Sequence, residues 1–291
     1  MMMLAFLMMF ANEFRDAEVQ WRQEHEASMR EDDSWLNLVG LFWLQQGENS
    51  FGSSDMAHIV LPKHSTVNLA GAFQLKEGQV HYEMSRAQRA TVFSGGEGEG
   101  QLQNKGTLTV GDVMHHNHLR MFLIERDGRL ALRARDLRSK DFVNFEKLEF
   151  YRPKKKYVIE ADYVPYEEHD TIAITTVINT EIILKVPGVL RFELDGKQVE
   201  LLPTLESEED NKLFVMFKDQ TSGSSTYAGG RFLYAEMPDG PAKVTLNFNR
   251  AFNPPCAYTD YATCPLPPAE NWLDIAIEAG ERTYVRPYIE E

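Results

Sequence analysis

The chain has 291 residues, with 44 acidic and 30 basic side chains, and its formal net charge at pH 7 is −14. Nucleic-acid binding needs a basic surface for the phosphates, so this acidic balance argues against nucleic acid as a general partner. An apolar fraction of 43% and a charged fraction of 25% argue against a disordered chain, and 2 cysteines are too few for a disulfide framework.

The chain begins with an almost wholly apolar stretch, residues 1–11. This stretch lacks a basic n-region, a small-residue cleavage site and the ~20 apolar residues that a membrane span requires. We therefore expect no stable membrane insertion and a cytoplasmic location. A helix is predicted from Asn12, which can cap it, to about Arg30. It would form a helical extension over residues 1–34 and pack against a sheet.

From Trp35 onward, short apolar segments alternate with turn residues, which is typical of a mostly antiparallel β protein. Asp-Gly between alternating segments is a strong hairpin signal, and it occurs at Asp127-Gly128 and Asp195-Gly196. A further hairpin is expected around Lys76-Glu77-Gly78. Other predicted strands are residues 157–163, 172–176, 181–185, 213–217, 231–235, 244–248 and 273–277.

A change of pattern near residue 140 predicts two antiparallel β-sandwich or open-barrel units, residues 35–138 and residues 139–291. In the first, the segments 47–54, 58–62, 71–75 and 78–80 resemble the core of a forkhead-associated domain, which is a β-sandwich. That family has a phosphate-contacting arginine where this chain has Ser53. The resemblance therefore implies the fold without phosphothreonine recognition.

Polar and aromatic residues are concentrated in the second predicted unit, in the segments 217–223, 226–232 and 247–253. These segments, beginning Phe217-Lys-Asp-Gln-Thr-Ser-Gly and continuing to Glu281, resemble a bacterial family known as domain of unknown function 1684. The resemblance implies a grouping and no activity.

We expect the second unit to bind a small polar or anionic ligand. Arg231 begins an apolar strand, so a buried guanidinium there needs an anionic or carbonyl partner. A ligand carboxylate or phosphate would supply one. Alternatively, Asp219 pairs with Arg231, and the polar residues of the family signature, the segments 217–223, 226–232 and 247–253, only stabilise the fold. The predicted ligand-binding residues are Asp219, Thr221, Tyr227, Arg231, Asn249, Asn253 and Tyr258.

Two other functions stay open beside a binding protein. One is a small-molecule hydrolase that uses the same pocket, and the other is a non-catalytic structural or protein-interaction module. The segment Gly223-Ser-Ser-Thr-Tyr227 lacks the second glycine of a serine nucleophile elbow and has no histidine nearby in sequence. No cofactor is implied.

Four residues are predicted to be structural. Cys256 and Cys264 lie in a stiff, proline-rich loop, as packed thiols or as a disulfide. Arg135 and Asp136 end a predicted strand and are expected to anchor the two units to each other.

The histidine cluster His115, His116 and His118 is the best candidate for binding a metal. His116 and His118 would share one face of a strand. The cluster lacks an evident third ligand, so solvent-facing imidazoles at a hairpin edge are favoured, and we predict no metal site.

Overall fold

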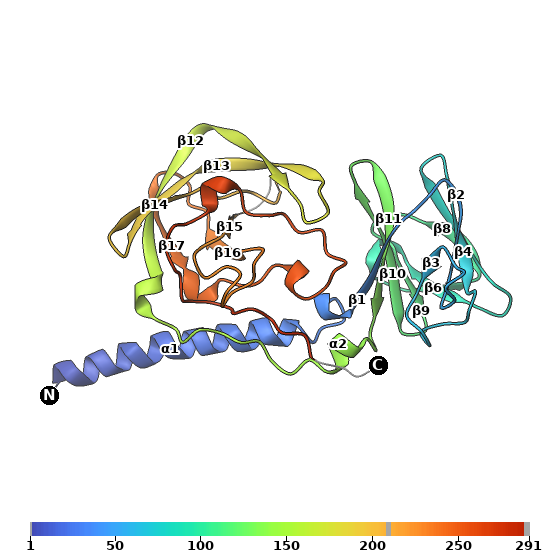
Figure 1. The fold of residues 1–291 in the computed structure, drawn as a ribbon, viewed down its shortest axis with the longest axis horizontal. Helices are drawn as coiled ribbons and strands as arrows, with labels where there is room; N and C mark the ends of the chain where they lie inside the picture. Colours follow the sequence, from blue (N-terminus) through green and yellow to red (C-terminus); the bar gives the residue numbers. More distant parts are fainter. Residues whose placement is uncertain (1, 208–210, 288–291) are drawn as a thin grey trace. The chain divides into compact units, whose positions relative to one another are not determined.

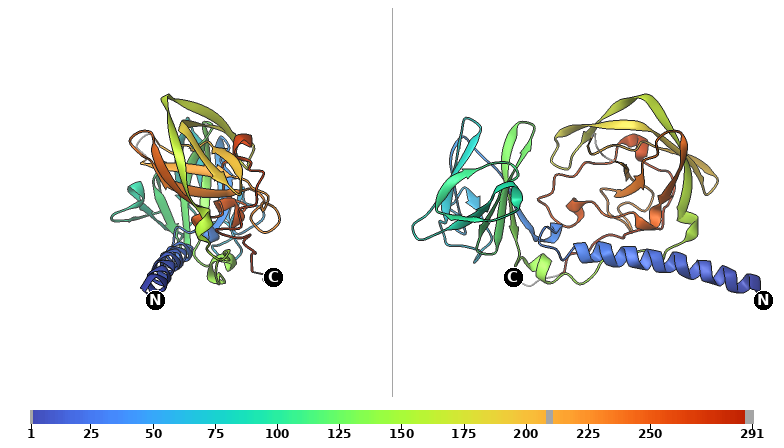
Figure 2. Two further views of the ribbon diagram at one scale, coloured as in Figure 1. Left: turned by 90° about the vertical axis from the view of Figure 1, so that its left-hand side faces the viewer. Right: turned by 180° about the vertical axis from the view of Figure 1, so that it is seen from behind.

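The computed structural model describes residues 2–207 and 211–287, with side chains from Glu13 onward. The described chain forms two compact units (Figures 1 and 2). The first, called the N-terminal unit, comprises residues 29–145. The second, called the C-terminal unit, joins the N-terminal helix to residues 146–286. The predicted fold class, mostly β with antiparallel sheets and an N-terminal helix, is confirmed.

Two sheets build the N-terminal unit around one hydrophobic core that includes Phe51, Phe73 and Leu132. Its strand pairs are antiparallel, apart from β2 with β3. The first sheet has the order β1 (Leu38–Trp43), β11 (Arg129–Asp136), β10 (Leu119–Arg126), β9 (Val113–His116), β6 (Ala90–Phe93) and β7 (Gln101–Gln103). The second has the order β3 (Ile59–Val60), β2 (Gly47–Gly52), β4 (Gly71–Lys76), β5 (Gln79–Met84) and β8 (Lys105–Leu108).

The C-terminal unit contains a four-stranded and a two-stranded antiparallel sheet around its own core, which includes Tyr157, Leu213 and Phe248. The larger sheet has the order β14 (Lys197–Leu201), β13 (Glu181–Leu194), β12 (Val158–Thr175) and β17 (Ala242–Asn247). The smaller sheet pairs β15 (Lys212–Phe217) with β16 (Arg231–Glu236).

The helices are short apart from α1 (Met2–Ser28), which belongs to the C-terminal unit. Among the described residues, no helix combines the length and the apolar character that crossing a membrane requires. The others are α2 (Lys140–Val143) and the 3-10 turns η1 (Trp35–Asn37), η2 (Ser94–Gly96), η3 (Lys155–Tyr157), η4 (Phe248–Arg250), η5 (Pro255–Ala257) and η6 (Ala269–Asn271).

All three predicted hairpins are confirmed. A two-residue turn that matches the twist of its strands needs positive φ at both central residues, which glycine and aspartate tolerate well. Both central residues have positive φ in each of the three turns, at Glu77-Gly78, Asp127-Gly128 and Asp195-Gly196.

Three element predictions are wrong. Helix α1 continues through Asn12, so that residue does not cap it; the preceding Met, Leu and Ala residues favour helix. The segments 157–163, 172–176 and 181–185, together with residues 190–194 before the Asp195-Gly196 turn, form only two long strands, β12 and β13, whose pairing shifts register between Pro165 and Asp170. Residues 273–277 are not a strand. In that segment, side chains make the backbone hydrogen bonds that a neighbouring strand would otherwise make. The Ile277 N–H donates to Asp219 (3.2 Å), and the Ile277 carbonyl accepts from Arg231 (3.0 Å).

Candidate functional site

A buried ion pair lies at the start of β16. Arg231 is 1% exposed, and its Nη2 lies 2.7 Å from Oδ2 of Asp219. The guanidinium also donates to the backbone carbonyls of Ile277 and Ala279 and lies over the Phe217 ring, 5.2 Å from its centroid. Burial lowers the pKa of Arg231, and the charge of Asp219 opposes that shift. The pair is therefore enclosed, with protein groups as its partners.

The second oxygen of Asp219 holds the following turn. Its Oδ1 accepts from the backbone N–H of Thr221 (2.8 Å) and from the Thr221 hydroxyl (2.5 Å). That hydroxyl lies 2.9 Å from the hydroxyl of Thr226. Asp219, Thr221 and Arg231 thus form one network, and this is the pairing that the fold-stabilising alternative predicts.

A second buried network surrounds Glu281. Its Oε1 accepts from the Tyr258 hydroxyl and from Nδ2 of Asn253 (2.8 Å), while Oε2 accepts from the Asn253 N–H (3.0 Å). His25, from α1, brings its Nε2 to 3.4 Å from Oε2. Burial raises the pKa of Tyr258 well above its ordinary value, and the neighbouring carboxylate adds to the shift. Asn253 and Tyr258 are therefore brought together by a residue outside the predicted set.

The remaining predicted ligand residues have separate partners. The side-chain amide of Asn249 makes two hydrogen bonds to the backbone of Lys154. Its Oδ1 accepts from the Lys154 N–H (2.9 Å), and its Nδ2 donates to the Lys154 carbonyl (3.0 Å). Tyr227 donates its hydroxyl to the carbonyl of Cys256 (3.1 Å), and burial raises its pKa. Cys256 and Cys264 are reduced thiols, with the Cys256 N–H 3.1 Å from Sγ of Cys264.

An open groove lies between the edges of β16 and β17, beside α1. Its volume is about 460 Å³. Three aromatic side chains line it, and its two cationic side chains come from the start of β15 and from η4. The lining residues are Trp21, Lys212, Leu233, Tyr234, Ala235, Glu236, Thr245, Asn247, Arg250 and Phe252.

The network around Glu281 fixes two walls of this groove. The His25 ring stacks on Trp21, with 5.0 Å between centroids and 7° between planes, and lies 5.5 Å from the Phe252 ring. Phe252 also precedes Asn253, whose backbone N–H and side chain bond to Glu281. One buried carboxylate therefore positions aromatic rings from both ends of the chain.

A second buried carboxylate, Glu18, lies behind the cationic side of the groove. It accepts from Nδ2 of Asn247 (2.8 Å) and from the guanidinium of Arg250 (3.3 Å). The Arg250 side chain is 38% exposed, so it keeps part of its surface in the groove. Lys212 faces Glu236 across the β15–β16 pair. The groove thus offers flat aromatic surfaces beside both cationic and anionic side chains.

The three histidines of the N-terminal unit have three different environments. His116 is buried between a threonine hydroxyl at 2.7 Å and a backbone carbonyl at 2.9 Å. His118 pairs with Asp136 (3.3 Å), and the His115 ring packs on Phe93 with 4.3 Å between centroids. Strand β9 ends at His116, so the prediction that His116 and His118 share a strand face is wrong. Among the described residues, no three His, Cys, Asp or Glu side chains are grouped to hold a metal ion.

Arg135 has partners inside the N-terminal unit. Its Nη1 donates to the carbonyl of Ser34 (2.8 Å), and the guanidinium lies 5.8 Å from the Trp35 ring centroid. Its anchoring role between the units stays a prediction.

Sequence reasoning missed the residues that build the groove, above all Trp21, His25 and Glu281. His25 and Glu281 are 256 positions apart, and neither lies in a recognisable motif. The one available signal was Glu281 at the end of the family signature, which marked the segment without showing its contacts.

Comparison with known proteins gives a family match for the C-terminal part of the chain. Residues 143–282 match the model of a family described as protein of unknown function (DUF1684). The solution NMR structure of an uncharacterized protein from Haloarcula marismortui is 36% identical, covering 48% of this chain and 78% of that chain with a TM-score of 0.42. The FhaA FHA domain, in a crystal structure with the intracellular domain of Rv3910, is 15% identical, covering 33% of this chain and 97% of that chain with a TM-score of 0.24. No curated protein matches.

Proposed function

We propose a function from the premise that this chain belongs, through residues 143–282, to the DUF1684 family. The C-terminal unit is a binding protein for a small ligand that joins a flat ring to a polar or anionic group. The ligand occupies the groove between β16, β17 and α1.

The observation that carries this proposal is the composition of the groove walls. Trp21, Tyr234 and Phe252 present aromatic rings, and the rings of Tyr234 and Phe252 are nearly parallel, 5.8 Å apart. Ligand pockets combine apolar and aromatic walls with a few polar groups that fix orientation. Lys212 and Arg250 are the cationic groups that would bind an anionic substituent.

Four of the seven residues predicted as ligand-binding support the walls of the groove without lining it. Arg231 and Asp219 fix the start of β16, whose Phe232 exchanges both backbone hydrogen bonds with Phe252 (2.9 and 3.0 Å). Asn253 and Tyr258 hold Glu281, which in turn orients His25. In this proposal these groups position the walls, and the ligand contacts the walls themselves.

A small-molecule hydrolase that uses the same groove is the second candidate. One observation favours it: Nε2 of His25 lies 3.4 Å from the buried Glu281 carboxylate, and a carboxylate that orients a histidine is typical of general bases. The His25 side chain is 19% exposed, so solvent reaches it. Turnover of p-nitrophenyl acetate that His25→Gln abolishes would favour this candidate. Equal turnover in both proteins would remove it.

The binding proposal is tested first by the intact mass of the purified protein, native against denatured. Mass that is lost on denaturation reports a retained ligand. Benzoate and benzyl alcohol, which share a ring and differ in charge, then serve as probes in calorimetric titrations. We expect benzoate to bind more tightly, and Lys212→Met to remove that preference.

Tyr234→Ala and Trp272→Ala form a matched pair for the same titrations. Both residues are exposed aromatics of the C-terminal unit, 42% and 59% respectively, but Trp272 lies outside the groove, beside Lys218. We expect Tyr234→Ala to weaken benzoate binding about five-fold, the value of one aromatic contact, and Trp272→Ala to leave it unchanged. Equal effects of the two substitutions would contradict the proposed site. An absence of bound mass together with no benzoate binding would favour the structural or interaction module.

A further inference from the structure

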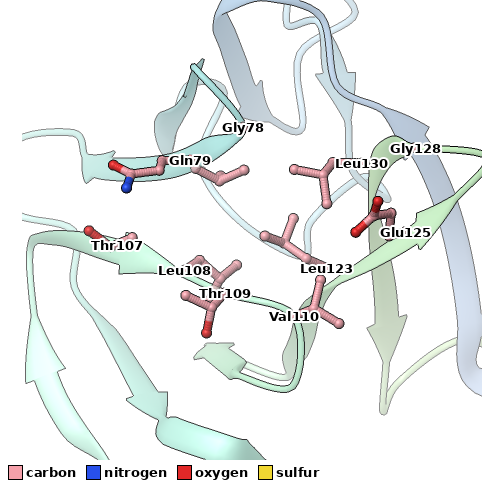
Figure 3. Close-up of a pocket in the computed structure, with 11 residues that line it drawn as sticks. Gly78, Gln79, Thr107, Leu108, Thr109, Val110, Leu123, Glu125, Gly128 and Leu130 are labelled. Carbon is pink, nitrogen blue, oxygen red and sulfur yellow. The ribbon is translucent and has the colours of Figure 1, made fainter.

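The N-terminal unit has a separate pocket at one open end of its two sheets. Its volume is about 390 Å³, within the range of small-molecule sites. The turns at Gly78 and Gly128 form its rim, where an added Cβ would meet no atom within 4 Å, so the mouth is open. Figure 3 shows side chains from both sheets around the space.

The interior of this pocket is aliphatic. Val80, Leu108 and Leu123 are buried and form the floor, with exposed fractions of 3% or less. Leu130 and Val110 complete the wall, and Val110 is 57% exposed. In Figure 3, Leu108, Leu123 and Leu130 point into the space between the sheets. The apolar surface that water reaches here belongs mainly to Leu130 and Val110, and an aliphatic group that enters the pocket covers that part of the wall.

Most of the polar groups around the pocket are already engaged. The Thr107 hydroxyl bonds to Nδ1 of His81 (3.0 Å), and the Thr109 hydroxyl donates to Asp112 (2.7 Å). Two polar side chains of the lining remain, Gln79 and Glu125, and only Glu125 is charged. The backbone carbonyl of Glu125 accepts from Arg126 (2.7 Å), whereas its carboxylate makes no hydrogen bond or ion pair with any residue that the structure describes.

We propose that this pocket binds a small aliphatic amine, with the hydrocarbon part between the sheets and the ammonium group at Glu125. A carboxylate without a partner at the edge of an aliphatic pocket is electrostatically complementary to a cation, and it repels anions of the same shape. The net charge of −14 favours the approach of cations in the same way.

This site is independent of the proposed groove. It lies in the other unit, in residues outside the family match, and its one lining charge is anionic, whereas the groove has two cationic side chains. Failure of one proposal therefore leaves the other standing.

Three probes with one six-carbon chain test the proposal on the full-length protein: hexylammonium, hexanoate and 1-hexanol. Binding is followed by the backbone amide shifts of Gln79, Thr107 and Gly128 in a ¹⁵N-labelled sample. We expect hexylammonium to shift these amides at roughly millimolar concentration, as the size of the ligand allows. We expect hexanoate to bind about three- to five-fold more weakly, the effect of one partly exposed charge pair.

Glu125→Gln identifies the charge that selects the ligand, and Glu83→Gln is its control. Glu83 is also an exposed glutamate of the N-terminal unit, on β5, but it does not line this pocket. We expect Glu125→Gln to remove the preference for hexylammonium over 1-hexanol while 1-hexanol binding is kept, and Glu83→Gln to change neither. The proposal is overturned if hexylammonium and hexanoate bind equally, if Glu125→Gln keeps the preference, or if none of the probes shifts these amides.

Discussion

Replacing Arg231 by methionine tests whether the buried ion pair stabilises the C-terminal unit. Methionine fills a similar volume without charge or donors. The Asp219 carboxylate, whose side chain is 0% exposed, would keep the N–H groups of Thr221 and Ile277 but lose its cation. The carbonyls of Ile277 and Ala279 would also lose the donors that now reach them.

The expected cost follows from this geometry. Breaking a buried charge pair by removing one partner typically costs about 3–5 kcal/mol, because the remaining charge stays buried without compensation. For a unit of this size, each kcal/mol lowers the melting temperature by about 2–4 °C, so Arg231→Met should lower it by roughly 10 °C. Adding Asp219→Asn should recover part of the loss, since the uncompensated charge is then removed as well.

Differential scanning calorimetry with Arg191→Met as the control provides the measurement. Arg191 pairs with Glu200 at 2.6 Å, but the two side chains are 54% and 62% exposed. An exposed pair contributes about 0–1 kcal/mol, so the control should hardly change the melting temperature. If Arg231→Met shifts the transition no more than Arg191→Met, the assignment of a stabilising role to the buried pair is wrong. Loss of benzoate binding with an unchanged melting temperature would instead place Arg231 in contact with the ligand.

Three further substitutions probe other parts of the fold by urea unfolding. The pKa of His115 is lowered from 6.5 to about 4, first by burial and then by a nearby arginine. Because the unfolded chain takes up that proton first, the free energy of unfolding should fall by about 1–2 kcal/mol between pH 6.5 and pH 4, and His115→Asn should remove this part of the fall. Tyr258→Phe removes a hydrogen bond to a buried carboxylate and should cost about 1.5–3 kcal/mol, against nearly nothing for Tyr261→Phe, whose residue is 39% exposed. Gly230 has φ +93°, and a Cβ there would lie 2.6 Å from a backbone oxygen, so Gly230→Ala should cost over about 1 kcal/mol. A Cβ at Gly240 meets no atom within 4 Å, so Gly240→Ala should be close to neutral.

Sequence patterns located the hairpins because turn chemistry is local. A central Asp-Gly pair determines the backbone of two residues, and the register of the flanking strands follows from it. Strand predictions from sequence patterns failed where tertiary contacts, and not local sequence, determined the backbone hydrogen bonding. Residues 157–163 and 172–176 were expected to be separate strands, but both belong to β12, which shifts register between Pro165 and Asp170, and proline is accepted at such an irregular pairing. Residues 273–277 have the composition of a strand, yet the Asp219 and Arg231 side chains bond to their backbone.

The candidate groove was beyond prediction from the sequence for a related reason. A residue pattern shows which side chains need a partner when buried, and it predicted this need for Arg231 correctly. For that guanidinium it left two partners open, Asp219 and a ligand anion, and it did not indicate the contact between His25 and Glu281. Trp21 is on α1 and Phe252 follows η4, and they become two walls of one groove only because the His25–Glu281 contact joins the helix to the end of the domain.

Several polar side chains of helix α1 bond to residues 146–286 of the C-terminal unit, so the position of the helix determines part of the groove. Glu18 bonds to Asn247, Arg22 donates to the carbonyl of Tyr151 (2.7 Å), and Glu26 accepts from the N–H of Leu148 (2.9 Å). These contacts hold in place Trp21, the residue of α1 that lines the groove. A ligand that contacts Trp21 binds only the docked helix, so by mass action it must stabilise the docking, by about 2.7 kcal/mol at a hundred-fold excess over its dissociation constant. Under the binding proposal, the helix is therefore part of the site as well as a support for the fold.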